Sequence, residues 1–469
     1  MRNRRGIAFG VVLVALAVLP GRVSAETQAV ATPPSGAISR NVQFVANVPL
    51  AAAISINFIG DTMFVSTAHG LYSFDVTDPA NPTLLGTLPV PIWENEDMDV
   101  DPVRHLVFLS RDPRGFTTPA TPGSAFPYGA VHIVDASDPS QLKELNAFLV
   151  PAGHTTTCVD RCDYIWTAGP YANAQTQPTY VGRPIYATDV RDPMNPKPCP
   201  KPLDLHRNDG VTDYVHDVQV DAAGVAWVSG EGGVRGYWTS GRHRDPLTGK
   251  TRVATGCAPI PYAGGGSPKS ATPTRFMHNA WRDLNAQIPG DPSSKGKILY
   301  ATEENVVTDC KSAGRFATYD LRGSFHGEGW RNIDETHFRM RVLDTWTPHN
   351  QGGSNGCASA HYFSDRGDGV LAYAFYTQGT RFLDVSDPRH IREIGYYRPD
   401  DANTWAAYWH DGYVFVADLQ RGVDVLKFTG SIGGRAIAAP AGGAAQTLAF
   451  SRTFAYLCPI HAPLAVAKP

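Results

Sequence analysis

A short unit that recurs along the chain limits its fold more than any other feature. In each copy an apolar segment ends at an aspartate, a second aspartate follows three residues later, and proline comes next. Four copies are clear, and they end at Asp75–Pro79, Asp135–Pro139, Asp189–Pro193 and Asp384–Pro388. The second aspartate can hydrogen-bond its own backbone as an Asx turn, and proline prevents the strand from continuing. The unit therefore predicts a β-strand that ends in a tight turn.

Seven units of this kind divide residues 51–430, and each contains a further strand bounded by Gly or Asp-Gly, as hairpins require. We therefore expect an all-β fold, a single seven-bladed β-propeller of four-stranded antiparallel blades. Residues 42–46 form an apolar strand that has no partner ahead of the first unit. We expect this N-terminal strand to complete the last blade and close the ring. Two β-sandwiches are the alternative, but they would not need so regular a period.

The four clear copies resemble the LVIVD repeat of secreted and surface bacterial propellers. The resemblance covers about residues 40–430, and the fourth, fifth and seventh units depart from it. It implies a propeller fold and an exported protein. It implies no particular activity, because this family is defined by its repeat and not by a catalytic signature.

The first 25 residues have the features of a secretory signal peptide. Arginines precede an apolar run over residues 7–19, and small residues end at Ala25. The start also resembles a twin-arginine export signal, although an ordinary basic segment has the same composition. A retained anchor is a further alternative, but the run is short for a bilayer span. We expect a signal peptide at 1–25, a linker at 26–37, the propeller at 38–430, and a Gly/Ala/Pro-rich linker with a C-terminal tail at 431–469.

Charge and cysteine content exclude several classes of protein. The chain has 41 Lys and Arg against 44 Asp and Glu, so it lacks the basic surplus of a nucleic-acid binder. We expect no integral membrane span and a monomer whose partner is a small molecule or a surface protein. Seven cysteines leave at least one thiol unpaired within the chain. Cys158 and Cys162 could clip a tight turn, but their spacing does not suit a cysteine-based zinc site.

Histidines recur where the innermost strand of successive blades should begin. His154 and His216 are 62 residues apart, and so are His216 and His278. His361 lies near the matching position of the sixth blade. Since these strand starts surround the axis of a propeller, we expect the four imidazoles to converge there. Imidazole suits Fe, Cu and Zn, so the set is a candidate mononuclear transition-metal site.

Five carboxylates near these positions could orient ligated rings from an outer shell. They are Glu96, Asp97, Asp217, Glu303 and Glu304. The alternative is structural, because a repeat can place a histidine at each strand start only to bond the neighbouring blade.

Three functions remain open from the sequence. The first is an exported propeller that presents a ligand- or partner-binding site on one face. The second is a mononuclear metalloenzyme, oxidative in its chemistry, with a substrate near the aromatic loops at 116–128 and 171–180. The third is a structural adhesion module of the cell surface. No nucleophile elbow, P-loop or dinucleotide fingerprint is present to add a fourth.

Overall fold

The computed structural model describes residues 32–433, except 91–94, 113–128, 170–184, 204, 206, 209–210, 213–214, 247, 267–274, 306–313, 323–339 and 349–359. The expected signal peptide, the tail beyond residue 433 and both aromatic loops lie outside the described residues. In the part that is described, no helix combines the length and the apolar character that crossing a bilayer requires.

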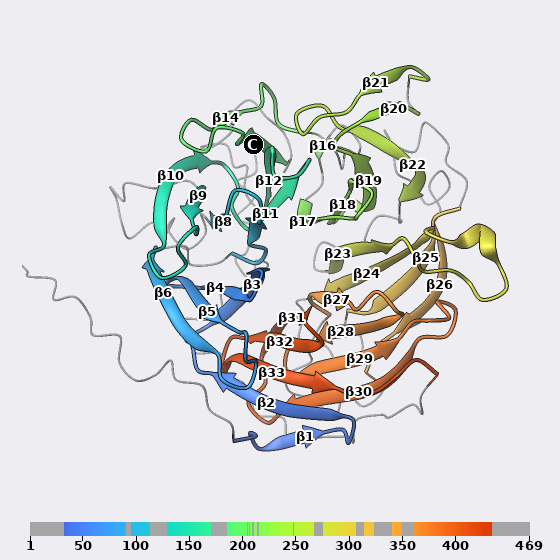
Figure 1. Ribbon diagram of the computed structural model, residues 1–469. Helices are drawn as coiled ribbons and strands as arrows, with labels where there is room; N and C mark the ends of the chain where they lie inside the picture. The colour runs from blue at the N-terminus through green and yellow to red at the C-terminus, as the bar shows by residue number, and fades with distance from the viewer. Residues whose placement is uncertain are drawn as a thin grey trace, which may run out of the picture.

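Seven four-stranded antiparallel sheets are arranged in a ring, which confirms the predicted β-propeller (Figure 1). The first three blades comprise β3 (Ala53–Ile59), β4 (Thr62–Thr67), β5 (Gly70–Asp75) and β6 (Thr83–Pro89); β7 (Asp99–Asp101), β8 (Leu106–Arg111), β9 (Gly129–Asp135) and β10 (Lys143–Val150); and β11 (Thr155–Val159), β12 (Tyr164–Ala168), β13 (Tyr186–Asp189) and β14 (Lys197–Pro198).

The remaining blades comprise β17 (Val215–Val220), β18 (Val225–Gly230), β19 (Gly233–Trp238) and β22 (Ile260–Gly266); β23 (Arg275–Asp283), β24 (Ile298–Asn305), β25 (Phe316–Asp320) and β26 (Arg341–Trp346); β27 (Phe363–Asp365), β28 (Val370–Ala374), β29 (Thr380–Asp384) and β30 (Arg392–Pro399); and β31 (Thr404–His410), β32 (Tyr413–Asp418), β33 (Gly422–Phe428) and β2 (Val42–Val48). The small elements outside the four-stranded pattern are β1 (Gly36–Ile38), β15 (Arg207–Asn208), β16 (Val211–Thr212), β20 (Arg242–Arg244), β21 (Thr251–Val253) and a 3₁₀ turn at Pro292–Ser294.

The N-terminal strand β2 closes the ring, as the sequence predicts. It pairs with β33 from Val42 opposite Phe428 to Val48 opposite Val423. The last blade is therefore built from both ends of the propeller, and it cannot form until both are present. The preceding strand β1 adds to the outer edge of the sixth blade through β30, beginning at Gly36.

The aspartates of the repeat make the turns that the sequence predicts. The second aspartate of the first copy, Asp78, accepts a hydrogen bond from the Ala80 N–H at 3.0 Å. The first aspartate, Asp75, also accepts one, from the Thr77 N–H at 2.9 Å. Each copy therefore makes two consecutive Asx turns, which end one strand and start the next without help from the core.

Apolar side chains fill the spaces between blades. Alternate residues of β4 face opposite ways, so that Met63 and Val65 pack against the seventh blade and Phe64 packs against the second. Each of the seven interfaces between adjacent blades has a cluster of this kind among the described residues. Both faces of the middle strands are buried, which explains why most of their residues are apolar.

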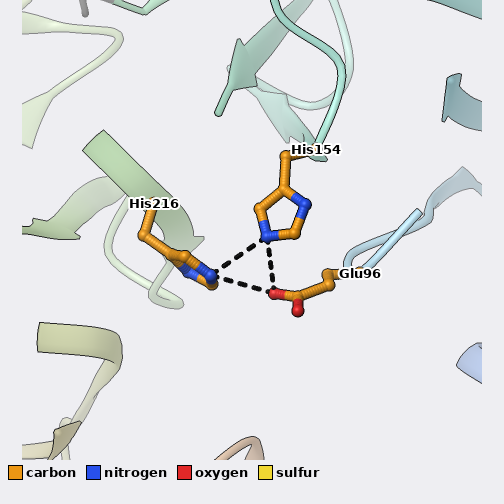
Figure 2. A group of neighbouring side chains, drawn as sticks. All are labelled: Glu96, His154 and His216. Atoms are coloured by element: carbon orange, nitrogen blue, oxygen red, sulfur yellow. Dashed lines mark hydrogen bonds and ion pairs between the residues drawn. The ribbon is translucent and has the colours of Figure 1, made fainter. Parts of the chain in front are cut away.

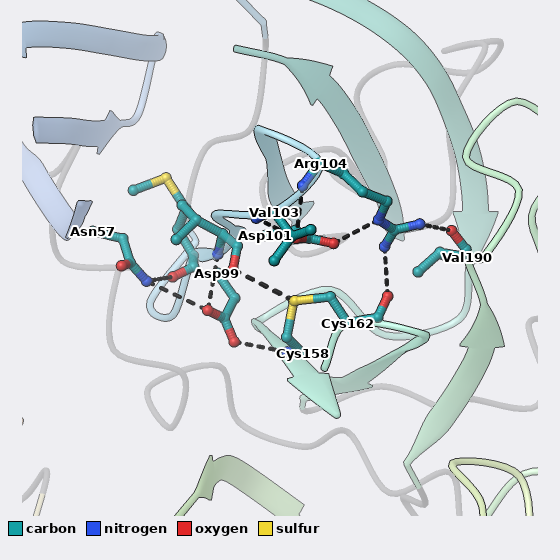
Figure 3. The surroundings of a disulfide bond; sticks show 10 residues. Asn57, Asp99, Asp101, Val103, Arg104, Cys158, Cys162 and Val190 are labelled. Carbon is teal, nitrogen blue, oxygen red and sulfur yellow. Dashed lines mark hydrogen bonds and ion pairs between the residues drawn. A yellow bond between two sulfur atoms is a disulfide. The ribbon is translucent and has the colours of Figure 1, made fainter. Parts of the chain in front are cut away.

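Two disulfides are present among the described residues. Cys158 and Cys162 join across the turn after β11, and Cys199 pairs with Cys257, a link that the sequence did not suggest. The first lies beside Asp99, whose Oδ2 accepts a hydrogen bond from the Cys158 N–H at 2.7 Å (Figure 3). The Cys162 carbonyl accepts one from Arg104 Nη2 at 2.7 Å, so side chains of the second blade hold this turn of the third.

A glycine substitution at the ring closure should be far more damaging than one nearby. Gly422 has φ +87°, and an added Cβ would lie 2.3 Å from both the Leu50 nitrogen and the Val48 oxygen. Gly412, in the same blade, has φ +78° and nothing within 4 Å of an added Cβ. We expect Gly412→Ala to cost about 1 kcal/mol of unfolding free energy and Gly422→Ala roughly 3 kcal/mol or more. Denaturant unfolding would measure both, and equal losses would contradict the tight closure.

Candidate metal centre

Each histidine of the predicted set lies at the start of an innermost strand, and the structure brings all four together. His154 precedes β11, His216 and His278 lie in β17 and β23, and His361 precedes β27. All four side chains are fully buried. They come from the third, fourth, fifth and sixth blades and meet at the hub of the ring.

Local irregularities explain why two of these side chains face inward. The pairing of β17 with β18 shifts register between Val215 and Asp217, which leaves His216 as an extra residue. The pairing of β23 with β24 shifts in the same way between Met277 and Ala280, around His278. A β-bulge changes the direction of the side chain of the residue that it leaves unpaired. Here each bulge turns an imidazole away from the paired strands.

Glu96 occupies the centre of the cluster. Its Oε2 lies 3.0 Å from Nε2 of His154, 3.0 Å from Nε2 of His216 and 3.4 Å from Nε2 of His278. Its Oε1 lies 3.3 Å from Nε2 of His361. Figure 2 shows the first two of these rings directed at the carboxylate. The sequence suggested an outer role for Glu96, but the structure places it among the inward nitrogens.

The other suggested carboxylates lie in different places. Glu304 is at the edge of the cluster, with Oε2 3.9 Å from Nε2 of His278, and it accepts a hydrogen bond from the Tyr376 hydroxyl. Glu303 faces away and forms an ion pair with Arg315 at 2.7 Å. Asp97 and Asp217 share contacts with Gln219, and no hydrogen bond of theirs to the imidazoles is found among the described residues.

Three of the rings are oriented by acceptors that contact Nδ1, on the side away from Glu96. Nδ1 of His154 lies 3.0 Å from Oδ2 of Asp112, and Nδ1 of His361 lies 2.5 Å from the Trp405 carbonyl. Nδ1 of His216 lies 3.3 Å from the His278 carbonyl. A carboxylate and two carbonyls can only accept, so the network assigns a proton to each of these Nδ1 atoms.

The assigned tautomers determine what the rings present to the centre. A neutral imidazole that carries its proton on Nδ1 has a lone pair on Nε2. Three such lone pairs therefore face the oxygens of Glu96, and Nε2 of His154 and His216 are only 3.1 Å apart. Lone pairs facing a carboxylate at these distances repel unless a cation or additional protons lie between them.

Burial of the imidazoles disfavours their binding of additional protons. It lowers the pKa of His216 to about 4, and the attraction of Glu96 offsets only part of this effect. Burial, together with the charges of His361 and His216, holds the pKa of His278 well below its usual value. Burial disfavours ionisation of Glu96, but His154, His216 and His361 outweigh it and keep the pKa of this carboxyl well below its usual range.

The donor set fits a metal ion. The potential ligand atoms form three overlapping groups of three residues, and within each group the atoms lie within 4.8 Å of one another. The groups are Glu96 with His154 and His216, Glu96 with His278 and His361, and His216 with His278 and Glu304. Ligand bonds near 2.1 Å place adjacent donors of one ion about 3.0 to 3.5 Å apart, which matches the separations around Glu96. Buried histidine and glutamate groups of this chain could therefore bind a metal.

Several residues of the centre carry no recognisable mark in the sequence. Asp112 follows β8 in a different blade from the histidine that it orients, and the Trp405 contact uses the backbone. Tyr376, which contacts Glu304, has φ +43°, a conformation that bulky residues rarely adopt. Such strain often accompanies functional sites, but it depends on backbone angles that the residue types do not reveal.

Comparison with known proteins adds little to this picture. No model of a known protein family matches the chain, and no curated protein matches it in sequence. The solved structures that match include the periplasmic gluconolactonase of Pseudomonas aeruginosa, with 13% sequence identity, a TM-score of 0.47, and coverage of 83% of this chain and 94% of that one. The propeller architecture described above follows from the strand pairing itself, and we draw nothing about activity from this similarity.

Proposed function

We propose that this protein is a mononuclear metalloenzyme whose transition-metal ion, Fe, Cu or Zn, is held on the propeller axis by His154, His216, His278 and His361. Glu96 would be a further ligand or would face the bound ion. The observation that carries the proposal is the set of three inward lone pairs, each imposed by an acceptor on the opposite side of its ring. A purely structural network would instead need a donor on the inward side.

The chain's own residues would act on the ion in distinct ways. The Asp112 carboxylate would hold His154 in its ligating tautomer and strengthen it as a donor, as such outer contacts do at metal sites. Tyr376 would hold Glu304 beside His278. Bound Fe or Cu supplies redox chemistry, and a histidine-rich site suits both metals. With Fe or Cu as the bound ion, we therefore propose an oxidative reaction on a small substrate.

Elemental analysis of the exported protein tests the proposal. We expect about one transition-metal ion per chain and its loss in the double variant His216→Ala/His278→Ala. His390→Ala is the matched control, because His390 is exposed and contacts only a turn aspartate among the described residues. Metal-free native protein, or metal that survives the double change, would refute the proposal and return the histidines to a structural role.

Retention of the metal should depend on pH in a characteristic way. A proton competes with the metal for each imidazole, so a ring whose pKa is low loses its metal only in more acidic solution. Since the pKa of His216 is about 4 and that of His278 also lies well below its usual value, we expect metal content to stay constant from pH 8 to about 5. It should fall only in more acidic solution, where protons can displace the metal from the imidazoles. Dialysis at each pH followed by elemental analysis measures this, and half-loss near pH 6.5 would contradict it.

Three further parts of the proposal rest on the sequence alone. We infer that the protein is of the LVIVD type, that residues 1–25 direct its export, and that residues 26–37 and 431–469 flank the propeller as linker and tail. The N-terminal sequence of the exported protein checks the second part, and it should begin at Glu26. If the first residues remain attached, the anchor alternative holds.

A further inference from the structure

A second polar cluster lies next to the imidazoles, and it contains only oxygen and amide groups. We call it the oxygen collar, and its members come from the innermost strands of the first, second, fourth, sixth and seventh blades. They are Ser55, Asp97, Asp217, Gln219, Tyr362 and Tyr408. Three of them directly follow a residue of the metal centre in the sequence, since Asp97 follows Glu96, Asp217 follows His216 and Tyr362 follows His361.

Contacts within the collar join different blades, and one of them skips over a blade. Gln219 Nε2 lies 3.1 Å from Oδ2 of Asp97 and 3.1 Å from Oδ2 of Asp217, although the third blade lies between the second and the fourth. On the other side, the Ser55 hydroxyl lies 3.5 Å from the Tyr408 hydroxyl. Because both carboxylate oxygens contact one nitrogen, about 6 Å is the largest distance that can separate them.

The two carboxylates of the collar have no cationic partner. Among the described residues, no Lys, Arg or His side chain forms an ion pair with Asp97 or Asp217. Oδ1 of Asp217 and the hydroxyl of Tyr362 are buried, and the nearest polar group to each is the other, at a geometry too poor for a full hydrogen bond. Asp217 and Tyr362 are at most 3% exposed. A carboxylate buried without a cationic partner is destabilised in its charged form, and a bound cation would compensate that cost.

Burial and the two carboxylates raise the pKa of the neighbouring tyrosine hydroxyls. Burial raises the pKa of Tyr362, and among the charged groups Asp217 adds most to this shift. Burial likewise raises the pKa of Tyr408, and here Asp97 is the leading charge. Each phenol therefore lies within electrostatic reach of one carboxylate.

We propose that the oxygen collar binds a hydrated divalent cation of the hard type, Ca²⁺ or Mg²⁺, separate from the transition metal of the imidazole centre. Hard cations prefer carboxylate, carbonyl and hydroxyl oxygen, whereas imidazole suits Fe, Cu and Zn. A half-turn of the Gln219 amide would replace its two donor contacts with a carbonyl oxygen ligand. Asp97 is partly exposed, so water can complete the coordination, as is common for Mg²⁺.

Terbium luminescence of the full-length protein tests the proposal. Tb³⁺ replaces Ca²⁺ in oxygen sites, and the phenols of Tyr362 and Tyr408 would sensitise its emission. We expect saturable emission that Ca²⁺ or Mg²⁺ displaces, and an affinity lowered on the order of 10-fold or more in Asp97→Asn and in Asp217→Asn, because each loses one ligand charge. Tyr362→Phe should reduce the emission of bound Tb³⁺.

Two controls separate the alternatives. Asp411→Asn alters an exposed trio formed with Asp61 and His410, and it should leave the emission unchanged. The double variant His216→Ala/His278→Ala should lose the transition metal but keep Tb³⁺ binding, so the failure of one site does not imply the failure of the other. The proposal is overturned if wild-type protein shows no saturable emission, which would mean that the carboxylates hold only a proton. It is also overturned if Asp411→Asn abolishes the emission while both collar variants retain it.

Discussion

Removal of the proposed transition metal is expected to lower the melting temperature by at least ~5 °C. A ligand that binds only the folded state stabilises it by about 4 kcal/mol when its free concentration is a thousand times the Kd. Without the ion, the inward nitrogens of His154, His216 and His361 face the Glu96 carboxylate with nothing to compensate their repulsion. The folded state would therefore lose binding energy and gain strain at a fully buried site.

Calorimetry of metal-free and reloaded protein measures this difference. Ca²⁺ and Mg²⁺ are supplied in excess to both samples, so that only the transition metal differs. The double variant His216→Ala/His278→Ala provides the control, since its melting temperature should not respond to the transition metal. A wild-type melting temperature that is the same with and without metal would argue for a self-sufficient hydrogen-bonded network. An equal response in the double variant would place the metal elsewhere.

Deletion of the N-terminal strand is expected to abolish folding. A chain that begins at Pro49 lacks β2, which buries Val42, Phe44 and Val48 between the first, sixth and seventh blades. Burial of three such side chains contributes roughly 5 to 9 kcal/mol, which is comparable to the whole stability of a typical domain. The loss would also expose the edge of β33, whose backbone groups pair with β2 along its whole length.

Restoring the strand from the other end of the chain is the sharpest control. The Thr429 N–H already donates to the Asn41 carbonyl at 2.8 Å, so the end of β33 and the start of β2 are neighbours. Residues 39–48 appended after residue 430 of the shortened chain should therefore form a hairpin and restore folding. A chain that begins at Ser39, and so lacks only β1, should lose about 1 kcal/mol. Circular dichroism and denaturant unfolding distinguish these variants, and a stable chain without β2 would show that closure is unnecessary.

The histidines of the centre could be located from the sequence because they recur at the period of the blades. His154, His216 and His278 are equally spaced in the sequence. When the blades close into a ring, residues that recur at the blade period all come to the same axis. Glu96 lies at the corresponding place in the second blade and was recognisable for the same reason, although its central position was not. Asp112 and Tyr376 do not recur at the blade period, so the repeat gave no way to identify them from the sequence.

The sequence by itself determined the fold class, the number of blades and the way in which the ring closes. The reason is that each blade is specified locally, by alternating apolar strands and by aspartates that complete their own turns. Only the tertiary structure decided which atoms face one another across the axis. The bulges at His216 and His278 depend on the register between strands of one blade, which the residue types do not reveal. The carbonyl that orients His216 and the amide that joins Asp97 to Asp217 act through contacts between blades. Such contacts join residues far apart in the chain, and no local pattern of residue types encodes their distances.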